Sequence, residues 1–168
     1  GFGLLTLIPA WAVDVLGGDV TTNGLLLSAR GVGSLLGALM IAYVGSGGTR
    51  GKIWAVGYFF TPIFFTIFAF IRAIPASLAL MVCIGWSVMA MINTTNALIQ
   101  SHVPDELRGR VMYVYSLVLM GGSPVGSLVA GMTADKIGEL NTVWLFSSMI
   151  MFFCLTTFIF RPKLRSLN

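Results

Sequence analysis

The stretch that decides the fold class lies in the middle of the chain. Residues 75–100 read PASLALMVCIGWSVMAMINTTNALIQ and contain no Asp, Glu, Lys or Arg. A helix of about 20 apolar residues crosses the hydrocarbon core of a bilayer, which is about 30 Å thick. Because residues 75–100 exceed that length, they predict a transmembrane helix rather than a core helix of a soluble domain.

The composition of the whole chain agrees with a membrane protein. Of its 168 residues, 57% are hydrophobic and 10% are charged, and the mean hydropathy is +0.91. A soluble domain is about 45–50% apolar. The predicted fold class is therefore all-α, a polytopic membrane helix bundle with six spans at 2–16, 24–45, 53–71, 75–100, 111–134 and 142–160. The first span is short, and we expect it to be truncated, with more of the chain upstream of Gly1.

The basic residues predict an orientation in the membrane, because cytoplasmic loops carry an excess of Lys and Arg. Two basic residues, Arg72 and Lys136, fall on one side. Seven fall on the other side: Arg50, Lys52, Arg108, Arg110, Arg161, Lys163 and Arg165. This bias predicts a cytoplasmic C-terminus, and it also places the loop that contains Asp105 and Glu106 in the cytoplasm. The basic residues form no stripe with interleaved aromatic residues, so nucleic-acid binding is not expected.

The six spans divide into two triplets that resemble each other. The tetrapeptide VGSL occurs at 32–35 in the second span and again at 125–128 in the fifth, and spans three apart run in opposite directions, as an inverted repeat requires. All Phe residues except Phe2 lie in the third or the sixth span, which we expect to be peripheral. Glycines concentrate in the second and fifth spans, which predicts close helix packing there: Gly31, Gly33, Gly37, Gly121, Gly122, Gly126 and Gly131.

Arg30 is the most informative single residue, because it lies well inside the second span. An ionised side chain at this depth costs at least about 2.5–3.5 kcal/mol on insertion scales, so it should face the bundle. One interpretation is a cation that attracts an anionic group of a substrate or pairs with an acid elsewhere in the protein. The alternatives are snorkelling to the non-cytoplasmic interface and a structural bond to carbonyl groups.

A polar stripe follows one face of the fourth span. Its members follow one another at intervals of three or four residues, which places them on one face of a helix: Trp86, Met89, Asn93, Asn96 and Gln100. A fainter stripe in the fifth span consists of Tyr113, Ser116, Met120, Ser123 and Ser127. Buried amides must find partners or water. These faces therefore line either helix contacts or an aqueous cavity, and the first stripe as a whole favours the wall of a substrate cavity.

The remaining candidates carry weaker signals. Asp14 is the one carboxylate that could lie within the membrane, where it would be a proton-relay acid, although an interfacial acid at a helix end is the simpler interpretation. His102 is most simply a solvated loop residue. Cys83 and Cys154 lack metal-site or disulfide spacing, so no metal site and no cofactor are predicted. No motif of a catalytic site occurs, and an enzyme is not expected.

Several motifs resemble one branch of the major facilitator superfamily, the enterobactin-exporter-like and macrolide-efflux-like proteins called transmembrane secretion effectors. The most specific is VPDELRGRVM at 103–112. Further similarities, which together extend over nearly the whole chain, are DVLGG at 14–18, GLLL at 24–27, Gly31 to Gly33 with Gly37, GSPVG at 122–126, Gly131 and Asp135 to Gly138. The loop at 45–52 departs from the superfamily pattern, because it lacks the acidic residue of that signature.

The resemblance implies that the spans are helices seven to twelve of a twelve-helix fold. It implies a secondary active exporter of a small molecule such as a drug or siderophore, working by alternating access and coupled to protons, in the bacterial cytoplasmic membrane. Its partners would be the lipid bilayer, the substrate and a missing N-terminal half of the same chain. The residues at the cytoplasmic gate or in cytoplasmic loops would then be Arg50, Lys52, Asp105, Glu106, Arg108 and Arg110. Contacts with lipid headgroups are an alternative role for Arg108 and Arg110. The alternative is a self-sufficient six-helix oligomeric channel or membrane scaffold.

Overall fold

The computed structural model describes residues 2–44 and 50–160, and side chains within 3–43 and 53–157. All regular elements in these ranges are helical. Five helices are long and apolar enough to cross a membrane, which confirms the predicted membrane bundle. Their bounds are α3 (Val20–Val44), α4 (Arg50–Phe70), α5 (Ile74–His102), α6 (Asp105–Ile137) and α7 (Glu139–Phe160).

The first predicted span, near 2–16, is helical and short, but it is not one regular helix. The segment consists of α1 (Phe2–Leu5), α2 (Ile8–Ala10) and a turn of π-helix, η1 (Trp11–Val15). Pro9 has no N–H to donate to the carbonyl of Leu5, four residues earlier, and α1 ends at that residue. In η1 the N–H of Leu16 donates to the carbonyl of Trp11 at 3.0 Å, the i→i+5 bond of a π-helix.

The polar break before α3 forms a helix cap. The N–H of Thr22 donates to Asp19 Oδ1 at 2.9 Å, and the N–H of Asp19 donates to Thr22 Oγ1 at 3.3 Å. This reciprocal arrangement satisfies donors that the first helical turn leaves free. The hydrogen bonds from Thr22 lower the pKa of Asp19, because they favour its ionised form.

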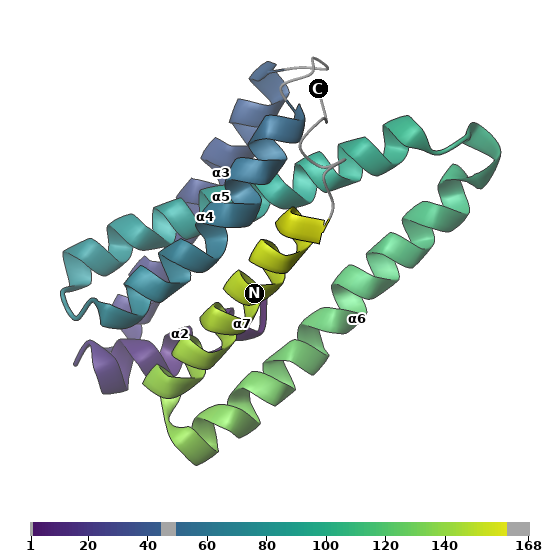
Figure 1. Cartoon of the computed structure of the whole chain (residues 1–168). Helices are drawn as coiled ribbons and strands as arrows, with labels where there is room; N and C mark the ends of the chain where they lie inside the picture. Colours follow the sequence, from purple (N-terminus) through teal and green to yellow (C-terminus); the bar gives the residue numbers. More distant parts are fainter. Residues whose placement is uncertain (1, 45–49, 161–168) are drawn as a thin grey trace.

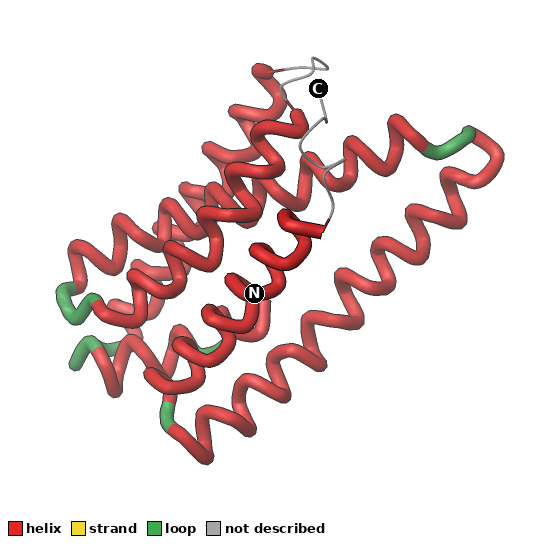
Figure 2. The backbone as a smooth tube through the Cα atoms, in the orientation of Figure 1, coloured by secondary structure: helices red, strands yellow, loops and turns green. Residues whose placement is uncertain are grey.

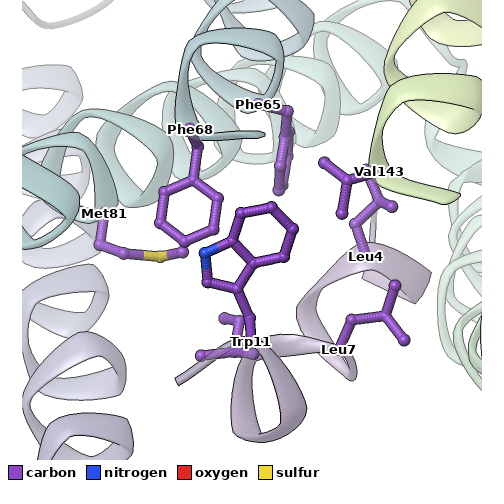
Figure 3. Close-up of a pocket in the computed structure, with 8 residues that line it drawn as sticks. Leu4, Leu7, Trp11, Phe65, Phe68, Met81 and Val143 are labelled. Atoms are coloured by element: carbon purple, nitrogen blue, oxygen red, sulfur yellow. The ribbon is translucent and has the colours of Figure 1, made fainter. Parts of the chain in front are cut away.

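Helix α5 lies at the centre of the packing, between α3 and α4 (Figure 1, Figure 2). Helix α4 also packs on α7, and α6 lies at the edge of the bundle, where it contacts α1 and α7 more extensively than α5. Only 6% of the α6 span is buried, compared with 39% of the α5 span. The core is apolar and gathers side chains of the N-terminal segment, α4, α5 and α7, among them Leu4, Trp11, Phe65, Phe68 and Met81 (Figure 3).

The two VGSL tetrapeptides occupy equivalent places in the fold. Ser34 of the first faces Gly85 of α5, where a methyl group on the glycine would lie 3.0 Å from the Ser34 nitrogen. Ser127 of the second faces Gly3 of α1, where the same methyl group would lie 3.2 Å from the Ser127 nitrogen. Each triplet thus packs its second helix tightly on the first helix of the other triplet. The shared geometry is that of the predicted inverted repeat.

Glycine and phenylalanine patterns were only partly predictive of burial. Gly33 and Gly37 approach the α5 backbone and Gly126 approaches Gly3, as predicted. The expectation of close packing was wrong for four glycines, which have no atom within 4 Å of the place a Cβ would take: Gly31, Gly121, Gly122 and Gly131. Phe65 and Phe68 were expected at the periphery but are buried in the core, because α4 turns one face toward α5 and the N-terminal segment.

Gly33 and Gly31 form a matched pair for testing the helix contact. A methyl group on Gly33 would collide with the Val82 carbonyl oxygen of α5, whereas Gly31 has open space. We expect Gly33→Ala to separate the helices and destabilise the protein, since overpacking costs about 1–3 kcal/mol. Gly31→Ala should leave stability unchanged or raise it, because alanine is the better helix former. Melting temperatures of the two purified variants in detergent test this, and equal values would contradict the contact.

Candidate functional site

An open polar cavity of about 520 Å³ lies between the end of α5 and the start of α6. Three members of the predicted α5 stripe line it together with one predicted loop residue. The lining residues are Asn93, Asn96, Ala97, Gln100, Ser101 and Arg108. The helical spacing of the amides places them on one face of α5, and the turn at Val103 and Pro104 brings Arg108 back toward that face.

Local bonds organise the polar groups of this cavity. Gln100 Nε2 donates to Asn96 Oδ1, one helical turn away. Arg108 forms an ion pair with Asp105 at 2.5 Å, which steadies the guanidinium at the rim. This pair is exposed, and it contributes little to stability. The cavity therefore presents carboxamides and a cation to solvent, and these groups can hydrogen-bond a polar solute.

Arg30 lies outside this cavity, on the α3 face that packs against α5. Its backbone carbonyl contacts Gly85, and its side chain is half-buried. The guanidinium Nε is shielded from solvent and has no hydrogen-bond partner in the described part of the chain, and the same holds for Asn23 Oδ1 two turns earlier. A buried donor without an acceptor is costly. Arg30 is thus a cation held inside the bundle with capacity left to bind an acceptor.

The other residues predicted to line a path are not brought to this cavity. Ser127 Oγ donates to the Ser123 carbonyl at 2.9 Å within α6, so this hydroxyl is satisfied by its own helix. Trp86 is half-buried, and its backbone lies against Gly37 of α3. Glu106 is exposed at the start of α6 and is not among the lining residues. The side chains of Arg50 and Lys52 lie outside the described residues.

A pair of acids meets at the opposite end of the helices. Asp14 of η1 and Glu139, the first residue of α7, lie close enough for their carboxyl groups to interact electrostatically. The sequence singled out Asp14 but not Glu139, because 125 positions separate the two residues and the packing of the N-terminal segment brings them together.

The described residues contain no group of His, Cys, Asp and Glu side chains placed to hold a metal ion. Cys83 and Cys154 are free thiols, and the Cys154 thiol donates to the Tyr58 carbonyl at 3.4 Å. His102 is exposed, and its Nδ1 lies 2.9 Å from the Leu98 carbonyl oxygen.

Comparison with known proteins assigns the family. The family model for transmembrane secretion effectors matches residues 2–168. The chain belongs to this family of the major facilitator superfamily. It is similar to the multidrug efflux pump Tap of Mycolicibacterium fortuitum, with 29% identity over 150 residues, which cover 89% of this chain and 36% of that protein.

The chain also resembles the proton-coupled antiporter flippase LtaA of Staphylococcus saprophyticus, with 22% identity over 153 residues, which cover 89% of this chain and 38% of that protein. The chain thus spans little more than a third of the length of these two relatives. No solved structure matches the chain significantly. The predicted resemblance to the transmembrane secretion effectors is confirmed, and the family consists of membrane transporters.

Proposed function

We propose that this chain is the C-terminal half, helices seven to twelve, of a secondary active exporter that moves a small molecule out of the cell by alternating access. The proposed substrates are drugs, siderophores or similar metabolites. The polar cavity between α5 and α6 is the observation that carries this function. In this proposal it is the cytoplasmic mouth of the substrate path, and Asn93, Asn96 and Gln100 hydrogen-bond the entering solute.

Arg30 has a complementary role in the proposed path. It lies about 15 Å along α3 from Val20, near the middle of a bilayer core about 30 Å thick. An N-terminal six-helix half would cover the exposed apolar face of α3 and part of that of α6, and the substrate would bind between the halves. A cation with a free donor at this depth favours an anionic or strongly hydrogen-bonding group on the substrate, or an acid on the other half.

The orientation in the proposal follows the basic residues. The α5–α6 turn with Arg108 and Arg110 lies in the cytoplasm, together with the C-terminus. The end that holds Asp14 and Glu139 then faces outward. The name of the similar flippase states proton coupling, and the paired acids of this chain are a place where a proton could be taken up from outside.

The test of the proposed function is efflux by the full-length gene product in a drug-sensitive bacterial host. We expect expression to lower the accumulation of at least one fluorescent drug and to raise resistance to it. A protonophore should abolish both effects. The alternative, a six-helix channel or scaffold, predicts no energised efflux, and accumulation that is unchanged by expression or by the protonophore would favour it.

The acid pair makes a separate prediction about coupling. We expect Glu139→Gln to reduce efflux that is driven by an imposed pH gradient in proteoliposomes, because an amide at this position cannot bind and release a proton. Transport down a substrate gradient should persist. Asp135→Asn, an exposed acid of α6 near the same end, is the control. If Glu139→Gln and Asp135→Asn respond equally to the pH gradient, the pair has no role in coupling.

A further inference from the structure

A second groove lies between α5 and α6, distinct from the polar cavity. It has a volume of about 470 Å³, and its lining is almost entirely apolar apart from one cation. The lining residues are Ile99, Arg110, Val111, Val114, Tyr115 and Val118. A hydrogen bond joins α6 to α5 beside this groove, because the Tyr115 hydroxyl donates to the Ile92 carbonyl at 3.3 Å.

Each of the two arginines that follow the α5–α6 turn lines a different pocket, either the polar cavity or the apolar groove. Successive helical residues are rotated by about 100°, so Arg108 and Arg110 point in nearly opposite directions. Arg108 lines the polar cavity and pairs with Asp105. Arg110 lines the apolar groove, and no carboxylate among the described residues pairs with it. The groove therefore has an apolar wall, and Arg110, whose charge no described carboxylate neutralises, is one of the residues that line it.

The length of α6 sets the depth of these groups in a bilayer. Its 33 residues extend about 50 Å, longer than the 40–45 Å of a bilayer with its headgroups. Arg110 lies about 8 Å from the helix start, at headgroup depth, and Val118 lies about 12 Å deeper. In a bilayer that α6 spans, Arg110 would lie at the depth of the lipid phosphates, and the valines would follow the direction of an acyl chain.

We propose that this groove binds one anionic phospholipid, with its phosphate on Arg110 and an acyl chain along Val111, Val114 and Val118. The cytoplasmic leaflet is rich in anionic lipids, and basic pockets between transmembrane helices on that side bind their headgroups. A lipid phosphate complements Arg110, which pairs with no carboxylate among the described residues. The bound lipid fills the gap that separates α6 from α5 and holds the two helices at their present spacing.

Native mass spectrometry of the delipidated full-length protein tests this site. The probes are phosphatidylglycerol and phosphatidylcholine with the same acyl chains. We expect one tightly retained phosphatidylglycerol, preferred about fivefold over phosphatidylcholine, as expected for one basic contact near the membrane surface. Arg110→Gln should remove the preference, Arg110→Lys should keep it, and Arg108→Gln, the matched control two residues away, should also keep it.

A groove-filling variant separates the acyl chain from the charge. Val114→Trp should lower retention of both lipids, and because Arg110 is exposed, the Arg110 variants remain informative even if this larger side chain prevents folding. An unchanged preference in Arg110→Gln, or an equal loss in Arg108→Gln, would overturn the site. Failure of the parent protein to retain any lipid would also overturn it, and would indicate that a protein segment covers the groove.

Discussion

Replacing Arg30 with alanine is expected to reduce transport by the full-length protein about 10- to 100-fold, the range for losing a hydrogen bond to a charged group. The physical reason is the position of the guanidinium, which is half-buried against α5 with an unpartnered Nε. Holding a charged side chain inside the membrane raises the free energy of the folded protein, and binding an anionic or polar group to the guanidinium would offset this increase. The measurement is the initial rate of drug efflux at matched membrane abundance.

Arg30→Lys distinguishes charge from geometry at this position. Lysine keeps the charge but loses the planar donor fork of the guanidinium. We expect it to retain part of the transport that Arg30→Ala loses. Unchanged transport in both variants would remove Arg30 from the path and leave snorkelling or a structural bond as its role.

The double substitution of Asn93 and Asn96 by leucine is expected to reduce transport about tenfold or more, because two carboxamides that hydrogen-bond the solute are lost. Both side chains line the polar cavity beside Arg108. The substitution also makes the wall apolar, which disfavours water and polar solutes. Transport rate and substrate affinity should be measured in proteoliposomes, and the loss should appear in both.

Thr95→Val is the matched control for the two asparagines. Thr95 lies between them in sequence but on another face of α5, where its hydroxyl accepts a hydrogen bond from Trp54 Nε1 at 2.9 Å. Its loss should lower the stability of the α4–α5 contact and leave transport per folded molecule unchanged. An equal loss of transport in Thr95→Val would mean that the cavity face has no special role.

Much of the fold could be predicted from hydropathy. A helix that crosses the bilayer needs a long run of uncharged residues, and such runs, for example 75–100, can be read directly from the sequence. The VGSL repeats predicted two related triplets, and their glycines and serines meet the partner helices in both. The break at Pro9 has a cause that is visible in the sequence, since proline lacks the N–H that a continuous helix needs. Burial of Phe65 and Phe68 was not predictable from composition, because the number of phenylalanines in a helix does not say which face meets the core.

Some residues of the candidate site were also predictable from the sequence, and others were not. The amide stripe of α5 was predictable, because helical spacing alone puts Asn93, Asn96 and Gln100 on one face. Arg108 and Arg110 were predicted together as loop residues, and only the orientation of α6 separates them into two hollows. Glu139 was missed because its contact with Asp14 depends on how distant segments pack.

The central claim is that the polar cavity between α5 and α6 opens to the cytoplasm. Labelling of single cysteines from each side of the membrane tests this claim most directly. The full-length protein would carry Asn96→Cys after Cys83→Ala and Cys154→Ala, and Asp135→Cys in the same background would report the opposite end. A membrane-impermeant maleimide should label Asn96→Cys only in inside-out vesicles and Asp135→Cys only in right-side-out vesicles.

A transported drug should slow labelling of Asn96→Cys, because the solute occupies the cavity. Labelling of Asp135→Cys should not change. The result that would contradict the account is labelling of Asn96→Cys only from outside, or labelling from inside at a rate that no transported drug alters.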